Sequence, residues 1–458
     1  MRALLLASPF ILFTMACFLF SLFFLAARGT LAFIPPLMCS LSGLTCLRER
    51  HAGIQNRTHS TAHPICLSRE LEAWASVHAN KSLRFWADKR PDTVYAANIP
   101  AHYFQMLPRV GVNRQKLVLM RLINGQVVSH MSNGSHGKRD AFTDNVVKSL
   151  VAALRRIQRA GWVAPNTSFV LSSHAAMDQY PPRLAEHVPI FTACMRTHGQ
   201  CPDRGILLPR PYKIFANDKP LRQDPGLRNV SWSQKRGLAI FRGALSSFMR
   251  VPLLLRAARS IRADIACTLL PQGFVRPLDL ELAMMGGLPA ASHKAETQPT
   301  SGDACLVERQ WQPNGPERWS QAFALPNCTK NNRISMAQQQ LFRYLIVPNG
   351  VGCADRLKQL LSSSSIVLLQ DSELSEFWQR DIQPYRHYLP VAPDFANLES
   401  QIEWAEQRPH EMRAMVARNN AYAAKYLTSR AQLCYIAVLL EKYAALFPPS
   451  KYSSQRSR

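Results

Sequence analysis

Residues 341–370 read LFRYLIVPNGVGCADRLKQLLSSSSIVLLQ, and this stretch decides the fold. The apolar residues 341–347 predict a strand, residues 348–352 a turn with two glycines, residues 353–362 a helix and residues 365–369 a second strand. A strand, a glycine turn, a helix and a strand in this order form the repeating unit of a parallel sheet covered by helices. The sequence therefore predicts an α/β protein.

The glycine turn, from Gly350 to Arg356, is the clearest chemical feature of this unit. Glycines after a strand allow a ligand to approach the backbone, and the N-terminus of the next helix presents amide donors to an anion. Arg356 falls in the first turn of the predicted helix, where a guanidinium can bind a diphosphate through two hydrogen bonds. Arg242, in Phe241-Arg242-Gly243 at the end of another apolar run, is a second candidate. Ordinary turn geometry for the glycines and a structural role for Arg242 are the alternatives.

Further elements are expected on both sides of this unit. Asn124-Gly125 between two apolar runs is the strongest local signal for a β-hairpin. Residues 142–158 have apolar side chains at helical spacing and predict a helix. The other expected elements are a helix at residues 71–78, strands at 168–172 and 238–243, a helix at 251–259, and helices over 397–447 that break at Pro409 and Thr428-Ser429.

The N-terminus predicts entry into the secretory pathway. Residues 3–27 are uncharged and mostly apolar, and about 20 such residues span a bilayer, so residues 1–27 are interpreted as an uncleaved signal anchor. A cleaved signal peptide is the alternative. Residues 28–70 suit a stem. Six N-glycosylation sequons agree with a location in the lumen. Of the eleven cysteines, Cys17 lies in the anchor, and the other ten form an even number that can pair fully in an oxidising compartment. The sequence does not determine which of these cysteines pair.

The charge balance narrows the class of ligand. The chain has 55 Lys and Arg residues against 30 Asp and Glu residues, a formal net charge of +25. This excess suits nucleic acid, an anionic membrane surface or an anionic ligand such as a nucleotide-sugar. The basic residues are scattered singly and no nucleic-acid-binding motif accompanies them, so nucleic acid is not expected as a partner. No Asp-x-Asp pair occurs, which fits a site that uses arginines and helix dipoles instead of a metal.

Residues 341–394 resemble the signature of glycosyltransferase family 90, which includes the protein O-glucosyltransferases of the Rumi type and fungal capsule-associated xylosyltransferases. An acidic-aromatic helix at Glu376-Phe377 and the run PYRHYLPV at residues 384–391 follow the family's order. The resemblance extends over roughly residues 116–447 and is strongest in the C-terminal half. The family's loop pattern YxxxxxGxGxxxR is matched by Tyr344, Gly350, Gly352 and Arg356.

The resemblance implies a GT-B fold, with two Rossmann-like lobes behind the N-terminal transmembrane anchor. The expected N-terminal acceptor lobe is residues 71–235, the nucleotide-sugar lobe is 236–430, and a C-terminal helix with a basic tail is 431–458. The implied reaction transfers glucose or xylose, with inversion, from a UDP-sugar to a hydroxyl group of a protein or glycan. The UDP-sugar is a co-substrate, and no cofactor or metal is expected. The expected location is the Golgi or endoplasmic reticulum membrane, as a single-pass type II protein with its catalytic domain in the lumen.

The resemblance also assigns candidate site residues. Family members have an Asp general base after a short strand and near a proline, and SFVLSSHAAMDQYPP (residues 168–182) places Asp178 there. His174 is the alternative base, and an ordinary surface-loop aspartate is the other interpretation. The donor-binding residues carried over are Arg242, Gly350, Val351, Gly352, Cys353, Ala354, Asp355 and Arg356.

Residues 353–355 depart from the family pattern, which often has an aromatic residue before the loop arginine. Cys353 is either a disulfide partner or a small buried residue. Asp355 either caps the helix or disfavours one particular donor. Together with the spacing around Asp178, this leaves a catalytically inactive lumenal relative that binds glycans or proteins as the alternative function. A basic lumenal protein that binds polyanions is a third hypothesis, and it predicts heparin binding without nucleotide binding.

Overall fold

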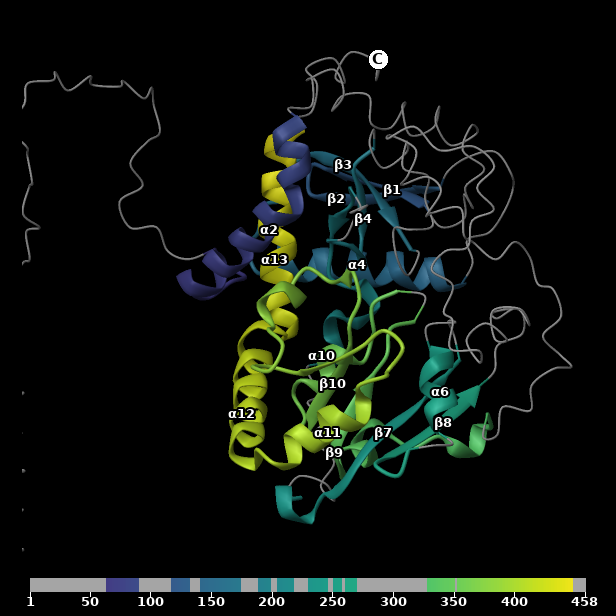
Figure 1. Ribbon diagram of the computed structural model, residues 1–458. Helices are drawn as coiled ribbons and strands as arrows, with labels where there is room; N and C mark the ends of the chain where they lie inside the picture. Colours follow the sequence, from purple (N-terminus) through teal and green to yellow (C-terminus); the bar gives the residue numbers. More distant parts are fainter. Residues whose placement is uncertain are drawn as a thin grey trace, which may run out of the picture. The chain divides into compact units, whose positions relative to one another are not determined.

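The computed structural model describes residues 63–89, 117–131, 141–173, 188–198, 204–217, 230–245, 250–257, 260–269, 328–350 and 352–447 (Figure 1). All of them lie in the compact unit Ser60–Arg458. The predicted anchor and most of the predicted stem lie outside the described residues, as do Asp178, His174 and Val351. Within the described segments, no helix is long and apolar enough to cross a membrane.

A five-stranded mixed sheet with the order β2-β1-β3-β4-β6 is built around the predicted hairpin. Asn124 and Gly125 have φ angles of 48° and 76°, as a tight two-residue hairpin turn requires, so the hairpin is confirmed. β1 pairs antiparallel with β2 and β3. β3, β4 and β6 run parallel to one another, so their carboxyl ends point in the same direction. The strands are β1 (Leu117–Ile123), β2 (Gln126–Met131), β3 (Thr167–Ser172), β4 (Ile190–Thr192) and β6 (Ile206–Leu207).

Helix α4 (Ala141–Arg159) packs against this first sheet and confirms the helix predicted at residues 142–158. Its buried residues include Val146, Leu150 and Leu154, which lie on one face because they are separated by about one turn. Gly161 follows the helix with a φ of 94°, a left-handed conformation that ends helices readily in glycine.

The second sheet is parallel throughout and has the order β12-β10-β9-β7-β8. Counted along the chain from β7, this is the order 2-1-3-4-5 of a doubly wound sheet, whose switch point lies between β7 and β9. The predicted α/β class with parallel strands is therefore confirmed. The strands are β7 (Arg236–Ala244), β8 (Ala263–Leu269), β9 (Phe342–Val347), β10 (Ile366–Gln370) and β12 (Leu389–Val391), and short helices α6 (Val251–Ala257), α9 (Met336–Gln339) and α10 (Leu357–Leu360) lie between them.

The predicted helix at residues 353–362 is reduced to the single turn α10. Serine hydroxyls bond to the backbone directly after this turn and compete with helical hydrogen bonding. Ser362 Oγ donates to the Gln359 carbonyl at 2.6 Å. At the other end, α10 begins at Leu357, so that Arg356 is its N-cap residue and does not lie in the first turn as predicted.

The acidic-aromatic helix predicted at Glu376-Phe377 is absent. The chain there forms the short strand β11 (Leu374–Ser375) and the 3-10 turn η9 (Gln379–Asp381). β11 pairs with β5 (Met195–Arg196), and Phe377 and Trp378 are only 3% and 1% exposed. Pairing and burial in the core thus override the local preference for a helix.

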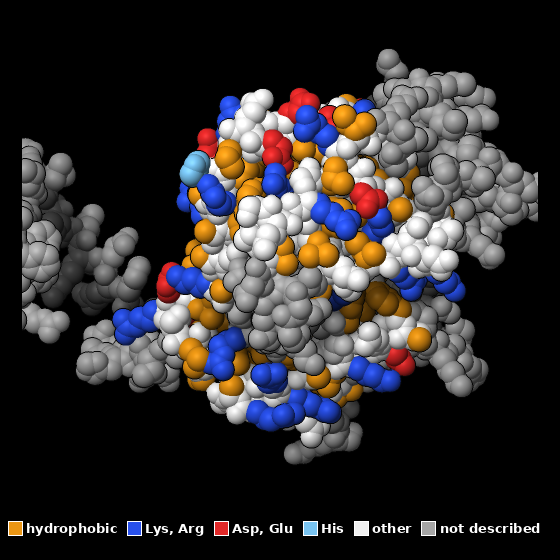
Figure 2. All heavy atoms as spheres, turned by 90° about the horizontal axis from the view of Figure 1, so that it is seen from below, with side chains coloured by type: hydrophobic (Ala, Val, Ile, Leu, Met, Phe, Trp, Pro, Cys, Tyr) orange, Lys and Arg blue, Asp and Glu red, His pale blue; other side chains and the backbone are white. Residues whose placement is uncertain are grey.

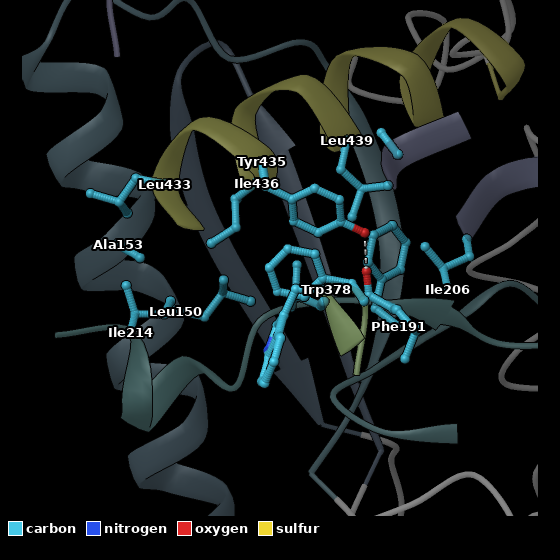
Figure 3. Close-up of a cluster of buried hydrophobic side chains, with 14 of the residues drawn as sticks. Leu150, Ala153, Phe191, Ile206, Ile214, Trp378, Leu433, Tyr435, Ile436 and Leu439 are labelled. Carbon is cyan, nitrogen blue, oxygen red and sulfur yellow. Dashed lines mark hydrogen bonds between the residues drawn. The ribbon is translucent and has the colours of Figure 1, made fainter. Parts of the chain in front are cut away.

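The C-terminal helices connect the second sheet to the first. They are α11 (Leu398–Glu406), α12 (Pro409–Tyr426) and α13 (Ser429–Leu446), which confirms the predicted breaks at Pro409 and Thr428-Ser429. α13 packs against α4 and against α2 (Arg69–Lys89), which is longer than the helix expected at residues 71–78. Figure 3 shows side chains of α13, among them Tyr435 and Ile436, within the core cluster that contains Phe191 of β4 and Leu150 of α4. The Tyr435 hydroxyl donates to the Leu207 carbonyl at 2.6 Å.

Three disulfides join the described cysteines: Cys66–Cys434, Cys194–Cys353 and Cys267–Cys328. The first ties the segment before α2 to α13. The second ties the loop after β4 of the first sheet to the glycine loop after β9 of the second. Of the two alternatives for Cys353, the structure selects the disulfide partner, and the pairs agree with the oxidising compartment that the sequence predicts.

Candidate functional site

A cavity of about 600 Å³ opens at the carboxyl ends of β7 and β9. Residues 242–244 at the end of β7 and the glycine loop after β9 line one side, and Arg210, Tyr212 and Lys213, which follow β6 of the first sheet, line the other. Ligands of doubly wound sheets bind outside the carboxyl ends of the strands at the switch point, which is where this cavity lies. Its volume is in the range of small-molecule sites.

The described residues that line the cavity are strongly cationic, with one carboxylate, that of Asp355. On the face of the molecule drawn in Figure 2, by contrast, Lys and Arg side chains are spread among hydrophobic and uncharged groups. The cationic lining residues are Arg210, Lys213, Arg242, Arg250, Arg333 and Arg356.

Arg250 and Arg356 both lie close to the Phe241 ring. Their guanidinium carbons lie 5.9 and 5.2 Å from the ring centroid. Both guanidinium groups donate only to backbone carbonyls among the described residues: Arg356 Nη1 to Arg242 at 2.9 Å, and Arg250 Nε to Asn349 at 2.9 Å and Nη1 to Ala244 at 2.7 Å.

Neither guanidinium forms an ion pair within the described part of the chain. Burial lowers the pKa of Arg356, and burial together with the charge of Arg356 lowers the pKa of Arg250 to about 10. Two half-buried cations that repel each other are stabilised by an anion placed between them. The electrostatics of the pair thus favour the binding of an anion.

Arg210 and Arg242 are in a different electrostatic state because each has a carboxylate partner. Arg210 lies 2.5 Å from Asp355 and 3.2 Å from Glu376. Burial opposes its charge, but these two carboxylates outweigh that effect and raise its pKa. Arg242 Nη2 lies 2.6 Å from Asp264 Oδ1. The positive charge of Arg210 and Arg242 is therefore largely neutralised within the protein, whereas that of Arg250 and Arg356 is not.

Gly243 determines how closely Arg356 can approach β7. A Cβ at this position would lie 2.7 Å from Phe241 Cζ and 2.8 Å from Arg356 Nη2. Phe241 is 1% exposed and has little room to move. The absence of a side chain at residue 243 thus allows the aromatic ring and the guanidinium to stack beside the strand.

Asp355 does not act as the cap of α10. Its carboxylate forms an ion pair with Arg210 and accepts a hydrogen bond from the Tyr212 hydroxyl at 3.2 Å, and its side chain is 43% exposed. The structure thus replaces the capping interpretation with a carboxylate that is held in place at the cavity wall. Among the described residues, no group of three His, Cys, Asp or Glu side chains is arranged to hold a metal ion.

The structure brings most of the donor-binding residues named from the sequence to one cavity. Arg242, Gly350, Gly352, Cys353, Asp355 and Arg356 line it, whereas Ala354 is buried beside it at 4% exposure. Val351, Asp178 and His174 lie outside the described residues.

Sequence reasoning did not include Arg210, Tyr212 and Arg250 among the site residues. Arg250 follows the Phe241-Arg242-Gly243 segment, and that position was a usable signal. Arg210 and Tyr212 follow the two-residue strand β6, which is too short to give a periodic pattern.

Comparisons with known proteins identify the family of this chain. A family model described as glycosyl transferase family 90 matches residues 219–456, just over half of the 458-residue chain. Protein O-glucosyltransferase 2 of Danio rerio is 31% identical over 105 residues, 23% of this chain and 21% of that protein. Protein O-glucosyltransferase 3 of Homo sapiens is 27% identical over 103 residues, 22% of this chain and 20% of that protein.

A bacterial relative, O-glucosyltransferase LpsA of Dichelobacter nodosus, is 26% identical over 118 residues, which cover 25% of this chain and 37% of that protein. The matched stretches thus span between a fifth and somewhat over a third of these relatives. The family model, by contrast, covers both the glycine loop that lines the cavity and the parallel sheet that carries this loop. The chain therefore belongs to glycosyl transferase family 90.

Proposed function

We propose that this chain transfers a sugar, glucose or xylose, from a UDP-sugar to a hydroxyl group of a protein or glycan, with inversion at the anomeric carbon. The observation that carries the proposal is the pair Arg250 and Arg356, two cations without a carboxylate partner in the described structure, at the switch point of a parallel sheet. The relatives are named O-glucosyltransferases, which supports glucose as the sugar.

On the donor side, the diphosphate of the UDP-sugar would lie against Arg250 and Arg356. The bond between the anomeric carbon and the diphosphate oxygen breaks in the reaction, and negative charge develops on the departing UDP. Fixed guanidinium groups stabilise that charge without reorganising, because backbone carbonyls and the Phe241 ring already hold them. The Asp355 carboxylate has capacity to accept further hydrogen bonds, and we assign it to hydroxyl groups of the donor.

On the acceptor side, a general base takes the proton of the attacking hydroxyl while its oxygen bonds to the anomeric carbon. We assign this role to Asp178, with His174 as the alternative. The described geometry supports a base in the segment after β3, because β3 runs parallel to β4 and β6 and their carboxyl ends therefore point in the same direction. Cys194 and Arg210, which follow β4 and β6, both contact Cys353 of the glycine loop. The carboxyl end of β3 therefore faces the cavity, as those of β4 and β6 do.

We further propose that the two sheets are the two lobes of a GT-B fold, with the donor held mainly by the second. The doubly wound order of the second sheet supports this proposal. The proposed boundaries are residues 71–235, 236–430 and 431–458. The chain would be held by residues 1–27 in the Golgi or endoplasmic reticulum membrane, with the described disulfides in the oxidising lumen.

The first experiment measures UDP release and sugar transfer by the purified full-length chain in detergent. UDP-glucose and UDP-xylose are compared, each with and without EDTA. We expect turnover with one of the two sugars, and we expect it to survive EDTA because arginines supply the positive charge. UDP binding without turnover would favour the inactive relative. Heparin binding that salt abolishes, without nucleotide binding, would favour the polyanion-binding protein.

The substitution Gly243→Ala tests the placement of Arg356. We expect the affinity for UDP to fall about tenfold, because the new methyl group displaces the guanidinium from the Phe241 ring. Gly237→Ala is the matched control on the same strand, since its Cβ would meet no atom closer than 3.6 Å. Calorimetric titration with UDP measures both variants. Equal loss of affinity in the two would contradict the role of Gly243.

A further inference from the structure

The disulfide between Cys194 and Cys353 connects the two sheets at the wall of the anion-binding cavity. Cys194 follows β4 of the first sheet, and Cys353 lies in the glycine loop, 159 residues later and three residues before Arg356. The two residues are 0% and 4% exposed. A covalent bond between the sheets is therefore buried beside the group that we assign to the diphosphate.

Neighbouring contacts hold the same part of the loop from the first sheet. Arg210 Nη2 donates to the Cys353 carbonyl at 2.8 Å. Thr192 Oγ1 donates to the Cys194 carbonyl at 3.1 Å and fixes the other end of the disulfide. Directly after Cys194, β5 pairs with β11 of the second half of the chain, and the Thr197 amide donates to the Glu373 carbonyl at 3.0 Å.

The loop has little support from its own helix. α10 is one turn long, and Arg356 is its N-cap without a side-chain capping bond. A four-residue helix cannot hold the preceding loop in place by itself, because helical structure this short is not stable alone. The position of Arg356 relative to Arg250 therefore depends on what fixes residues 350–355, and the disulfide is the strongest of those restraints.

We propose that Cys194 is a positioning residue for the donor loop: from the first sheet, and through its disulfide to Cys353, it places Arg356 for binding of the diphosphate. The inference rests on the proposed function. It means that the donor site is complete only when the two sheets are covalently joined, and that donor affinity depends on the redox state of this one pair. A dithiol reductant would break the disulfide by exchange, so that two protein thiols form and the reductant becomes a disulfide.

The test compares full-length Cys194→Ser with Cys66→Ser, which breaks the disulfide between the segment before α2 and α13. In Cys194→Ser, we expect the KM for the UDP-sugar to rise about 10- to 100-fold and kcat to fall as well, because a misplaced Arg356 binds the donor diphosphate more weakly and stabilises the charge on the departing UDP less well. Cys66→Ser is expected to lower the melting temperature and to leave the KM unchanged. The double variant Cys194→Ser/Cys353→Ser should match the single one, since both lack the same bond.

Hydrogen exchange separates this inference from the proposed function. We expect the amides of residues 350–361 to exchange faster in Cys194→Ser than in wild type, and this readout needs no ligand. If the wild type neither binds UDP nor turns over a sugar, the proposed function fails while the exchange result still decides whether Cys194 holds the loop. An unchanged KM in a folded variant, or unchanged exchange in this loop, would overturn the inference. If Cys194→Ser does not fold, Cys194→Ala/Cys353→Ala, with a small apolar residue at each buried position, replaces it in both measurements.

Discussion

Asp178→Asn is expected to lower kcat about 100- to 10,000-fold, the range that a positioned general base contributes. Asparagine keeps the size and shape of aspartate but cannot accept the proton of the acceptor hydroxyl. The affinity for UDP should not change, because the donor groups lie on the loops after β7 and β9 of the second sheet. Single-turnover transfer and calorimetric titration with UDP measure the two quantities separately.

His174→Gln is the matched comparison, because both side chains lie in the segment that follows β3. If Asp178 is the base, His174→Gln retains most of the turnover. Loss of turnover in His174→Gln, with activity intact in Asp178→Asn, would transfer the role to the histidine. In that case, kcat should fall as the pH decreases through the histidine pKa, since a protonated imidazole cannot accept the proton. If both variants retain full activity, no base lies in this segment.

The sequence was sufficient for those elements whose local signal and tertiary role agree. The Asn124-Gly125 hairpin, helix α4 and the breaks between α11, α12 and α13 depend on turn residues, helical spacing and proline, which act within a few residues. The parallel sheet was predictable for the same reason, because β9 and β10 are apolar runs separated by a glycine turn. Local chemistry sets all of these features.

The remaining features depend on partners far along the chain. The predicted helix at Glu376-Phe377 failed because β11 pairs with β5, about 180 residues earlier in the chain, and because the core takes up the aromatic side chains. Arg210 is part of the site only because the first sheet places it against Glu376 and the Cys353 carbonyl. The disulfide partner of Cys353 could not be predicted either, because it lies far along the chain and the number of possible pairings among ten cysteines is large.

Arg356→Ala is expected to lower kcat/KM for the UDP-sugar about 100- to 1,000-fold without lowering the melting temperature. The loss of activity follows from removing a fixed donor to the departing diphosphate. The unchanged stability follows from the electrostatics, because this half-buried cation has no carboxylate partner among the described residues and lies close to Arg250. Removing it gives up one hydrogen bond to a carbonyl but also relieves burial of charge and repulsion between the two guanidinium groups.

Two further arginine variants make this result specific. Arg210→Ala should differ from Arg356→Ala by lowering the stability by about 3–5 kcal/mol, because it leaves the Glu376 carboxylate buried without its ion pair. Arg84→Ala, on a side chain that is 84% exposed on α2, should change neither quantity. Thermal melts and steady-state kinetics on the three variants measure the pattern. If Arg356→Ala destabilises the protein as strongly as Arg210→Ala, and its activity falls no further than the loss of folded protein explains, then Arg356 supports the fold. The diphosphate must in that case be bound by other cations of the cavity.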